Sequence, residues 1–282
     1  MNLTYKQKTK IRNILLYLLT IVLVLWAVIP FIWSLSTSFK TSAEIYSGGM
    51  SLIPEASTIA NYEIIFERLT FFRFMLNSAL VTAATIIITV VFSLFAAYAF
   101  SRFDFPFRHL LLLFVLIPRI IPSVTRIIPL YQIFARFNLL DSYLGLILPY
   151  VADALPIAIW ILIGFFDGIP KSLEEAACID GCNRVQALWK VIIPLTAPGI
   201  VSVALFTFLR AWNEFIIAFT FISRNAMSTL PVSHYRVFEL FGLRDWGAIN
   251  AFTILAILPI VIFFMIFEKN LVKSMVSGAV KG

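Results

Sequence analysis

The stretch ILLYLLTIVLVLWAVIPFIWSL, residues 14–35, decides the class of fold. It runs for more than 20 residues without a charged side chain, and about 20 apolar residues are enough for a helix to cross a bilayer. No small-residue cleavage site follows it, so we interpret it as a retained transmembrane span and not as a secretory peptide. The sequence therefore predicts a membrane protein.

The composition of the whole chain supports this prediction. Of its 282 residues, 61% are hydrophobic and 13% are charged, whereas a soluble domain has about 25% charged residues. Six apolar stretches are long enough to cross a membrane as helices: residues 14–35, 74–100, 109–134, 143–166, 198–222 and 251–271. We expect an all-α, polytopic fold with about six transmembrane helices, in a single domain covering residues 1–282.

The basic residues give an orientation. Twelve Lys and Arg lie in the N-terminal tail, the turn between the second and third spans, segment 170–194 and the C-terminal tail, and seven lie in the alternate loops. By the positive-inside rule, both termini and segment 170–194 face the cytoplasm. The net charge of +7 is scattered over span ends and forms no stripe, so we expect lipid and not nucleic acid as a partner.

Segment 170–194, the elbow, is a polar insert between apolar spans. Ser172 and Glu175 have the spacing of a capping box, Gly181 permits a bend, and residues 184–191 suit a second short helix before Pro194. We expect a helix-Gly-helix elbow that docks a partner protein through carboxylates and small residues. The expected docking residues are Glu174, Glu175, Ala176, Ala177, Asp180 and Gly181. The alternative is an amphipathic helix on lipid headgroups, which the acids at its start disfavour.

The two cysteines of the chain, Cys178 and Cys182, also lie in the elbow. They are too few for a zinc site, and we interpret them as small packing residues. The sequence contains no G-x-x-x-x-G-K-[ST] and no other Gly-rich loop that would bind a nucleotide.

An ordered set of motifs surrounds the elbow. Glu175-Ala176-Ala177, Gly181 and Val191-Ile192-Ile193-Pro194 follow the pattern EAA-x3-G-x9-I-x-L-P, with Val191 and Ile193 as apolar departures. The other motifs are Asn61-Tyr62, Asn77-Ser78, Leu140-Asp141-Ser142-Tyr143, Leu148-Pro149-Tyr150, Trp212-Asn213-Glu214-Phe215, Thr229-Leu230-Pro231 and Gly278-Ala279-Val280-Lys281-Gly282. The set resembles permease subunits of binding-protein-dependent ATP-binding-cassette carbohydrate importers, and the maltose-type second permease subunit in particular.

The resemblance implies a function and partners. Such a subunit is not an enzyme and binds no cofactor. It forms a path for a saccharide with a second permease subunit in a prokaryotic inner membrane, two cytoplasmic ATPase subunits bind ATP and Mg and grip the elbows, and an extracytoplasmic binding protein delivers the substrate. The tail Gly278, Ala279, Val280, Lys281 and Gly282 would enter the ATPase interface. We also expect the aromatic outer loop, residues 223–250, to touch the binding protein, near Phe241, Gly242 and Leu243.

Charges inside the spans are costly and face a cavity or a partner. The candidate path residues are Arg119, Arg126, Asn213 and Glu214. Arg119 and Arg126 are two helical turns apart and share a face of the third span, which Pro122 should kink. They either form a cationic wall suited to an acidic saccharide or are neutralised by Asp153 or Glu214.

We expect neutralisation and an ordinary sugar, because an unpaired buried arginine is strongly disfavoured. Arg210 and Glu214, one helical turn apart, could also pair with each other. Three other functions stay open. A peptide or amino-acid importer permease shares the elbow motif, a secondary transporter would show internal repeats, and a purely structural subunit would lack polar residues at mid-depth.

Overall fold

The protein is all-helical in the residues that its structure, a computed structural model, describes: 5–47, 51–240 and 245–279. Within these described residues, four helices are long and apolar enough to cross a membrane, and the number is six if each of two bent helix pairs forms one span. The four are Thr9–Ser38, Phe71–Arg102, Tyr143–Asp167 and Trp246–Glu268. The predicted fold class, an all-α polytopic membrane protein, is therefore confirmed.

Contacts divide the chain into two compact units. The first combines Met1–Thr70 with Val237–Leu258, and the second combines Phe71–Arg236 with Pro259–Gly282. The first unit contains α1 (Tyr5–Ser38), α2 (Ser42–Tyr46), α3 (Ala60–Glu63), η1 (Ile64–Arg68) and the first part of α14 (Trp246–Ala279). The π-helical η5 (Arg236–Leu240) begins at the boundary between the units.

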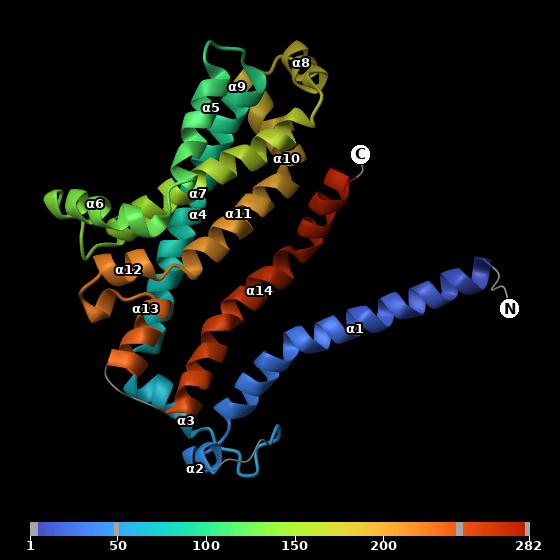
Figure 1. Cartoon of the computed structure of the whole chain (residues 1–282). Helices are drawn as coiled ribbons and strands as arrows, with labels where there is room; N and C mark the ends of the chain where they lie inside the picture. Colours follow the sequence, from blue (N-terminus) through green and yellow to red (C-terminus); the bar gives the residue numbers. More distant parts are fainter. Residues whose placement is uncertain (1–4, 48–50, 241–244, 280–282) are drawn as a thin grey trace. The chain divides into compact units, whose positions relative to one another are not determined.

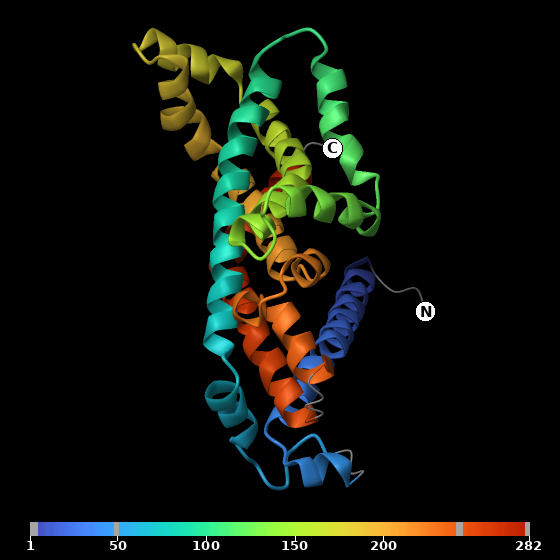
Figure 2. The same ribbon diagram turned by 90° about the vertical axis from the view of Figure 1, so that its left-hand side faces the viewer.

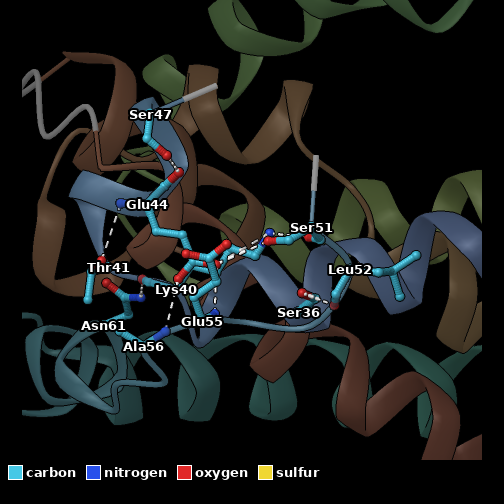
Figure 3. Close-up of polar contacts among 10 residues, drawn as sticks. All are labelled: Ser36, Lys40, Thr41, Glu44, Ser47, Ser51, Leu52, Glu55, Ala56 and Asn61. Atoms are coloured by element: carbon cyan, nitrogen blue, oxygen red, sulfur yellow. Dashed lines mark hydrogen bonds and ion pairs between the residues drawn. The ribbon is translucent and has the colours of Figure 1, made fainter. Parts of the chain in front are cut away.

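Polar contacts fix the segment that follows α1 in the first unit (Figure 3). The Glu44 carboxylate accepts hydrogen bonds from the Ser51 hydroxyl at 3.2 Å and from the Glu55 amide at 3.1 Å. Burial alone would raise the pKa of Glu44, but backbone donors such as Glu55 outweigh it and hold that pKa below its usual value. The buried Asn61 amide donates to the Lys40 carbonyl at 2.9 Å. The Asn61-Tyr62 motif therefore has a structural role in this segment.

Three long helices form the core of the second unit: α4 (Phe71–Arg102), α7 (Tyr143–Asp167) and α11 (Ala197–Trp212) (Figures 1 and 2). Small polar side chains are buried along α4, which lets helices approach closely: Ser78, Thr82, Thr85, Thr89 and Ser93. The remaining elements are α5 (Arg108–Leu116), η2 (Ile117–Arg119), α6 (Ser123–Arg136), α8 (Lys171–Ile179), α9 (Arg184–Ala187), η3 (Leu188–Ile192), α10 (Ile193–Leu195), α12 (Ile216–Phe221), η4 (Asn225–Met227) and α13 (Leu230–Tyr235).

The expected third span, residues 109–134, is broken. The helices Arg108–Arg119 and Val124–Arg136 meet at 97°, and α6 turns sharply away from α5 (Figure 1). Pro122 precedes α6 and has no N–H with which to continue the first helix, so the predicted kink is confirmed. The prediction that Arg119 and Arg126 share one face of a single helix is wrong, because the two residues lie on different helices on either side of the break.

The expected fifth span, residues 198–222, is also not one helix. Its first helix, α11, ends at Trp212, and α12 begins at Ile216. The Glu214 carboxylate accepts hydrogen bonds from the amides of Ile217 at 2.8 Å and Ala218 at 3.0 Å. Glu214 thereby satisfies free backbone donors at the start of α12. This local capping explains why the chain begins a new helix instead of extending α11.

Candidate functional site

The elbow has the predicted helix-Gly-helix form. Its first arm is α8, and its second arm runs through α9, η3 and α10. Between them, Gly181 has a φ of 91°, a left-handed conformation that glycine adopts without the clash a β-carbon would cause. The elbow lies at one end of the second unit, beside the turn that follows α4 (Figure 2).

The ends of the two arms differ from the prediction. The capping box expected at Ser172 and Glu175 is wrong, because α8 already begins at Lys171. A capping box does occur on the second arm, where Asn183 accepts from the Gln186 amide at 2.8 Å and its own amide donates to the Gln186 side chain at 2.9 Å. The second arm also continues through Pro194 to Leu195 and does not stop at the proline.

Glu174 faces the interior of the second unit. Its carboxylate pairs with the Arg102 guanidinium at 3.1 Å, and the side chains of Arg102 and Glu174 are only 6% and 13% exposed. The Tyr98 hydroxyl also donates to Glu174, and Arg102 bonds the Ile169 carbonyl at 3.1 Å. The expectation that Glu174 meets a partner is therefore wrong, because α4 already binds its carboxylate.

The second arm is held by apolar contacts. Leu188 and Ile192 are 2% and 0% exposed and belong to a core cluster with Leu94 and Tyr98 of α4 and Leu162 of α7. The first arm is thus held by an ion pair and the second by apolar packing. Both arms of the elbow are therefore attached to α4, and the second arm is also attached to α7.

The opposite side of the elbow is open. Glu175, Ala176 and Asp180 are exposed, and no ion pair found in the described part of the chain involves either of the two carboxylates. Ile179 lies among them with 86% of its surface exposed. Ala177 is buried, which corrects its assignment to the docking surface. The available surface is therefore acidic at two points and apolar at its centre.

The two cysteines are not the small packing residues that we expected from the sequence. Cys178 is exposed, Cys182 is partly exposed, and both are free thiols. Cys178 lies near the end of α8, and Cys182 follows Gly181. Their position at the tip of the elbow, beyond the side chains of that segment that pack on α4 and α7, explains the failed prediction.

A second site forms at Asp153, in the middle of α7. Three guanidiniums converge on its carboxylate: Arg119 at 3.1 Å, Arg126 at 3.0 Å and Arg210 at 2.6 Å. We call these four residues the Asp153 cluster. The predicted pairing of Asp153 with Arg119 and Arg126 is confirmed, whereas Arg210 was not expected there.

The alternative pair of Arg210 with Glu214 is wrong. Glu214 lies beyond the end of α11, so the one-turn spacing on a single helix does not hold. Instead, its carboxylate accepts from the Tyr150 hydroxyl of α7 at 2.7 Å and from the amides that begin α12. Arg210 consequently turns to Asp153.

A cavity of about 670 Å³ lies beside the cluster. Three of the four candidate path residues, Arg126, Asn213 and Glu214, line it, together with Arg210 and Asp153. Arg119 is not part of the lining and is connected to it through Asp153. The rest of the wall is largely apolar, and the volume is within the range of small-molecule sites, about 300–1,000 Å³.

Two sets of predicted residues fall at the margins of the structure. Phe241, Gly242 and Leu243, expected to meet a binding protein, lie outside the described residues, as do Val280, Lys281 and Gly282 of the tail. Gly278 and Ala279 are the last residues of α14. In the same outer loop, Phe238 is only 2% exposed and packs against Phe252 at 5.8 Å between ring centroids. Phe238 is therefore a core residue and not a partner contact.

Two of the quoted motifs are structural anchors whose role the sequence did not reveal. The Asn77 amide donates to the Ser228 carbonyl at 2.9 Å, and the Leu230 amide donates to the Ser78 hydroxyl at 2.8 Å. Asn77-Ser78 on α4 thus holds the Thr229-Leu230-Pro231 motif at the start of α13. Their pairing joins residues about 150 positions apart, which spacing alone could not indicate.

The helices, the surface elbow and the charged cavity together define an integral membrane subunit of a transporter. Comparison with known proteins agrees with this class. The profile of the binding-protein-dependent transport system inner membrane component matches residues 89–277, more than half of the chain. The chain belongs to this family.

Several relatives extend the match over nearly the whole chain. The sulfoquinovosyl glycerol transport system permease protein SmoH of Agrobacterium fabrum is 38% identical, covering 90% of this chain and 88% of SmoH. The trehalose/maltose transport system permease protein MalG of Thermococcus litoralis is 34% identical, covering 96% and 98%. These matches confirm the resemblance to ATP-binding-cassette sugar permeases.

The fold is also found in a solved structure. A chain of a bacterial ABC transporter that imports the acidic polysaccharide alginate superposes with a TM-score of 0.82 at 22% identity. The match covers 95% of this chain and 99% of that chain. The fold of this chain is therefore also that of a chain in a solved ABC transporter.

Proposed function

We propose that this chain is one of two permease subunits of an ABC importer, forms half of the path for a saccharide, and receives the ATP-driven movement through its elbow. The observation that carries the proposal is the two-sided elbow. Glu174 attaches α8 to α4 at 3.1 Å from Arg102, whereas Glu175 and Asp180 face outward without ion pairs. A force applied to the outer side therefore reaches the membrane helices through a short, rigid route.

The chemistry of the outer side fits an ATPase subunit with basic residues around an apolar pocket. Glu175 and Asp180 are acceptors for arginine or lysine, and the exposed Ile179 would fill the pocket between them. The sequence of this chain supplies no nucleotide-binding loop, so ATP and Mg would be bound by two partner ATPase subunits. With this arrangement the elbow and both termini are cytoplasmic, as the positive-inside rule predicts.

The saccharide assignment rests on relatives and on the family. SmoH and MalG are named for sulfoquinovosyl glycerol and for trehalose and maltose, and both align with at least 90% of this chain. A second permease subunit and an extracytoplasmic binding protein complete the importer. An alginate ABC transporter has been solved with its alginate-bound periplasmic protein, which supports a partner of this kind.

Charge reversal on the outer side of the elbow tests the proposal. Glu175→Lys should lower saccharide uptake by at least about 100-fold and release the ATPase subunits on purification, because two like charges would meet at the interface. The control is Asp104→Lys, an exposed acid in the turn after α4 that pairs with Arg108 at 3.2 Å, and this variant should transport normally. Uptake is measured in cells that lack the native chain, with membrane levels checked by immunoblotting. Normal uptake by Glu175→Lys would refute the coupling role.

A further inference from the structure

The charges of the Asp153 cluster do not balance. One carboxylate accepts from three guanidiniums, and the nearby Glu214 is already bonded to Tyr150 and to the start of α12. Counting both carboxylates, the three arginines leave one excess positive charge beside the cavity. The pairing predicted from the sequence does form, but the neutralisation expected to follow from it does not.

The cavity wall also contains buried donors without an acceptor. The Nε of Arg126 is buried and has no hydrogen-bond partner, and the same is true of the Thr207 hydroxyl. Thr207 is 0% exposed, and both residues line the cavity. Buried polar groups in folded proteins are nearly always bonded. Of the five unmatched buried side-chain atoms in the described part of the chain, the two that belong to residues lining the cavity are placed where a ligand with acceptor oxygens could meet them.

The remaining wall is suited to a ring and not to a bare ion. Pro129, Leu130 and Ile133 of α6 contribute an apolar surface, and such a surface packs against the carbon face of a sugar. An apolar wall also lowers the local dielectric constant, which strengthens the attraction between a guanidinium and an anion.

We propose that this cavity binds an acidic saccharide, with its carboxylate or sulfonate accepting hydrogen bonds from Arg126 and Arg210 and from the Thr207 hydroxyl. Arg210 bonds Asp153 through one terminal nitrogen and its side chain is half exposed, so further N–H groups remain available on it. The inference rests on the proposed permease function and specifies its substrate class. It replaces the neutral sugar that we expected from the sequence alone.

The test compares two probes on the full-length chain purified with its second permease subunit. One probe is a glucuronosyl-glucose disaccharide, and the other is the neutral glucosyl-glucose of the same linkage. Isothermal titration should give a dissociation constant at least about tenfold lower for the acidic probe, because one charge-assisted hydrogen bond strengthens binding by roughly that factor. Equal affinity for the two probes, or binding of neither, would overturn the proposal.

Matched variants locate the effect. Arg126→Gln and Thr207→Val should each remove most of the preference for the acidic probe over the neutral one. The controls are Arg136→Gln, an exposed arginine on the same helix α6, and Thr89→Val, an equally buried hydroxyl without a partner that lies outside the cavity. If Arg126→Gln does not fold, the preference for the acidic probe can still be compared between Thr207→Val and Thr89→Val, and this comparison tests the site. An unchanged preference in Thr207→Val and Arg126→Gln would overturn the site.

Two further outcomes separate this proposal from the proposed function. Sulfate that displaces the acidic probe at equal concentration would show an anion site that does not recognise the sugar, and would overturn the saccharide part. Saccharide uptake that depends on Glu175 but shows no acidic preference would leave the permease function standing and refute the anion site. Tight binding of the acidic probe without any uptake would support the anion site and refute the permease function.

Discussion

Two partly buried carboxylates of this chain are bound by arginines in different ratios. Glu174 in the elbow has one arginine, Arg102, and one tyrosine, Tyr98. Asp153 in α7 has three arginines. The first set is balanced and attaches one helix to another, whereas the second keeps unused donors beside a cavity. The ratio of charges thus separates a mechanical joint from a place prepared for a ligand.

The largest effect should come from removing the centre of the unbalanced set. Asp153→Asn leaves three partly exposed arginines without their carboxylate. The cost in unfolding free energy should approach, from below, the loss of about 3–5 kcal/mol that follows when one partner of a fully buried ion pair is removed. The variant should show a markedly lower Tm in detergent and no uptake. The exposed Asp104 provides the control, since Asp104→Asn should change neither. A Tm equal to that of the native protein would show that water already screens the cluster.

A smaller effect is expected at the balanced set. Arg102→Gln removes a charge-assisted bond worth about 1.5–3 kcal/mol and should loosen the elbow, so that ATP hydrolysis by the assembled importer continues while transport falls. Glu174→Gln should act in the same way, and the double variant should be no worse than either single one. Additive losses in this double-mutant cycle would mean that the two side chains act independently.

Loss of the tyrosine should have a still smaller effect. Tyr98→Phe keeps the ring contact with Phe166, whose centroid lies at 6.3 Å, and removes only the hydroxyl that donates to Glu174. We expect a loss of about 1 kcal/mol in thermal denaturation and a modest drop in transport relative to ATP hydrolysis. Uptake as low as that of Arg102→Gln would show that the hydroxyl and not the ion pair holds the elbow.

The smallest effect should come from the tip of the elbow. Asn183→Ala deletes one half of the capping box with Gln186, a change that costs about 0.5–2 kcal/mol of local helix stability. Because Leu188 and Ile192 remain buried, transport should fall less than twofold. Hydrogen exchange of residues 184–187 measures the local loss directly, and unchanged exchange there would contradict the capping assignment.

Local chemistry in the sequence predicted much of the fold. Apolar length marked the spans, Pro122 marked the break between α5 and α6, and Gly181 marked the bend of the elbow. The direction in which a side chain points was harder to predict from the sequence. Glu174 and Glu175 are neighbours of the same type, and only the presence of Arg102 on α4 sends the first inward.

The Asp153 cluster was predicted only in part. The pairing between neighbouring spans was found, but the pairing of Arg210 was missed because α11 ends before Glu214. Asp153 was a candidate partner of Arg119 because both lie deep in apolar segments. Arg210 was assigned to Glu214 on the assumption of a continuous helix, but α11 ends at Trp212. The convergence of three arginines on one carboxylate depends on the 97° bend and on tertiary contacts, and no spacing rule contains that information.

The exposed thiols give the elbow a chemical reporter of its own. The chain has only two cysteines, and both lie in the elbow, Cys178 exposed on α8 and Cys182 partly exposed after Gly181. A membrane-impermeant maleimide would therefore label the elbow alone, without any engineered residue, and only from the side of the membrane that it faces. The rate of alkylation in sealed vesicles of either orientation would read out the topology, and its protection during nucleotide turnover would follow the docking cycle in time.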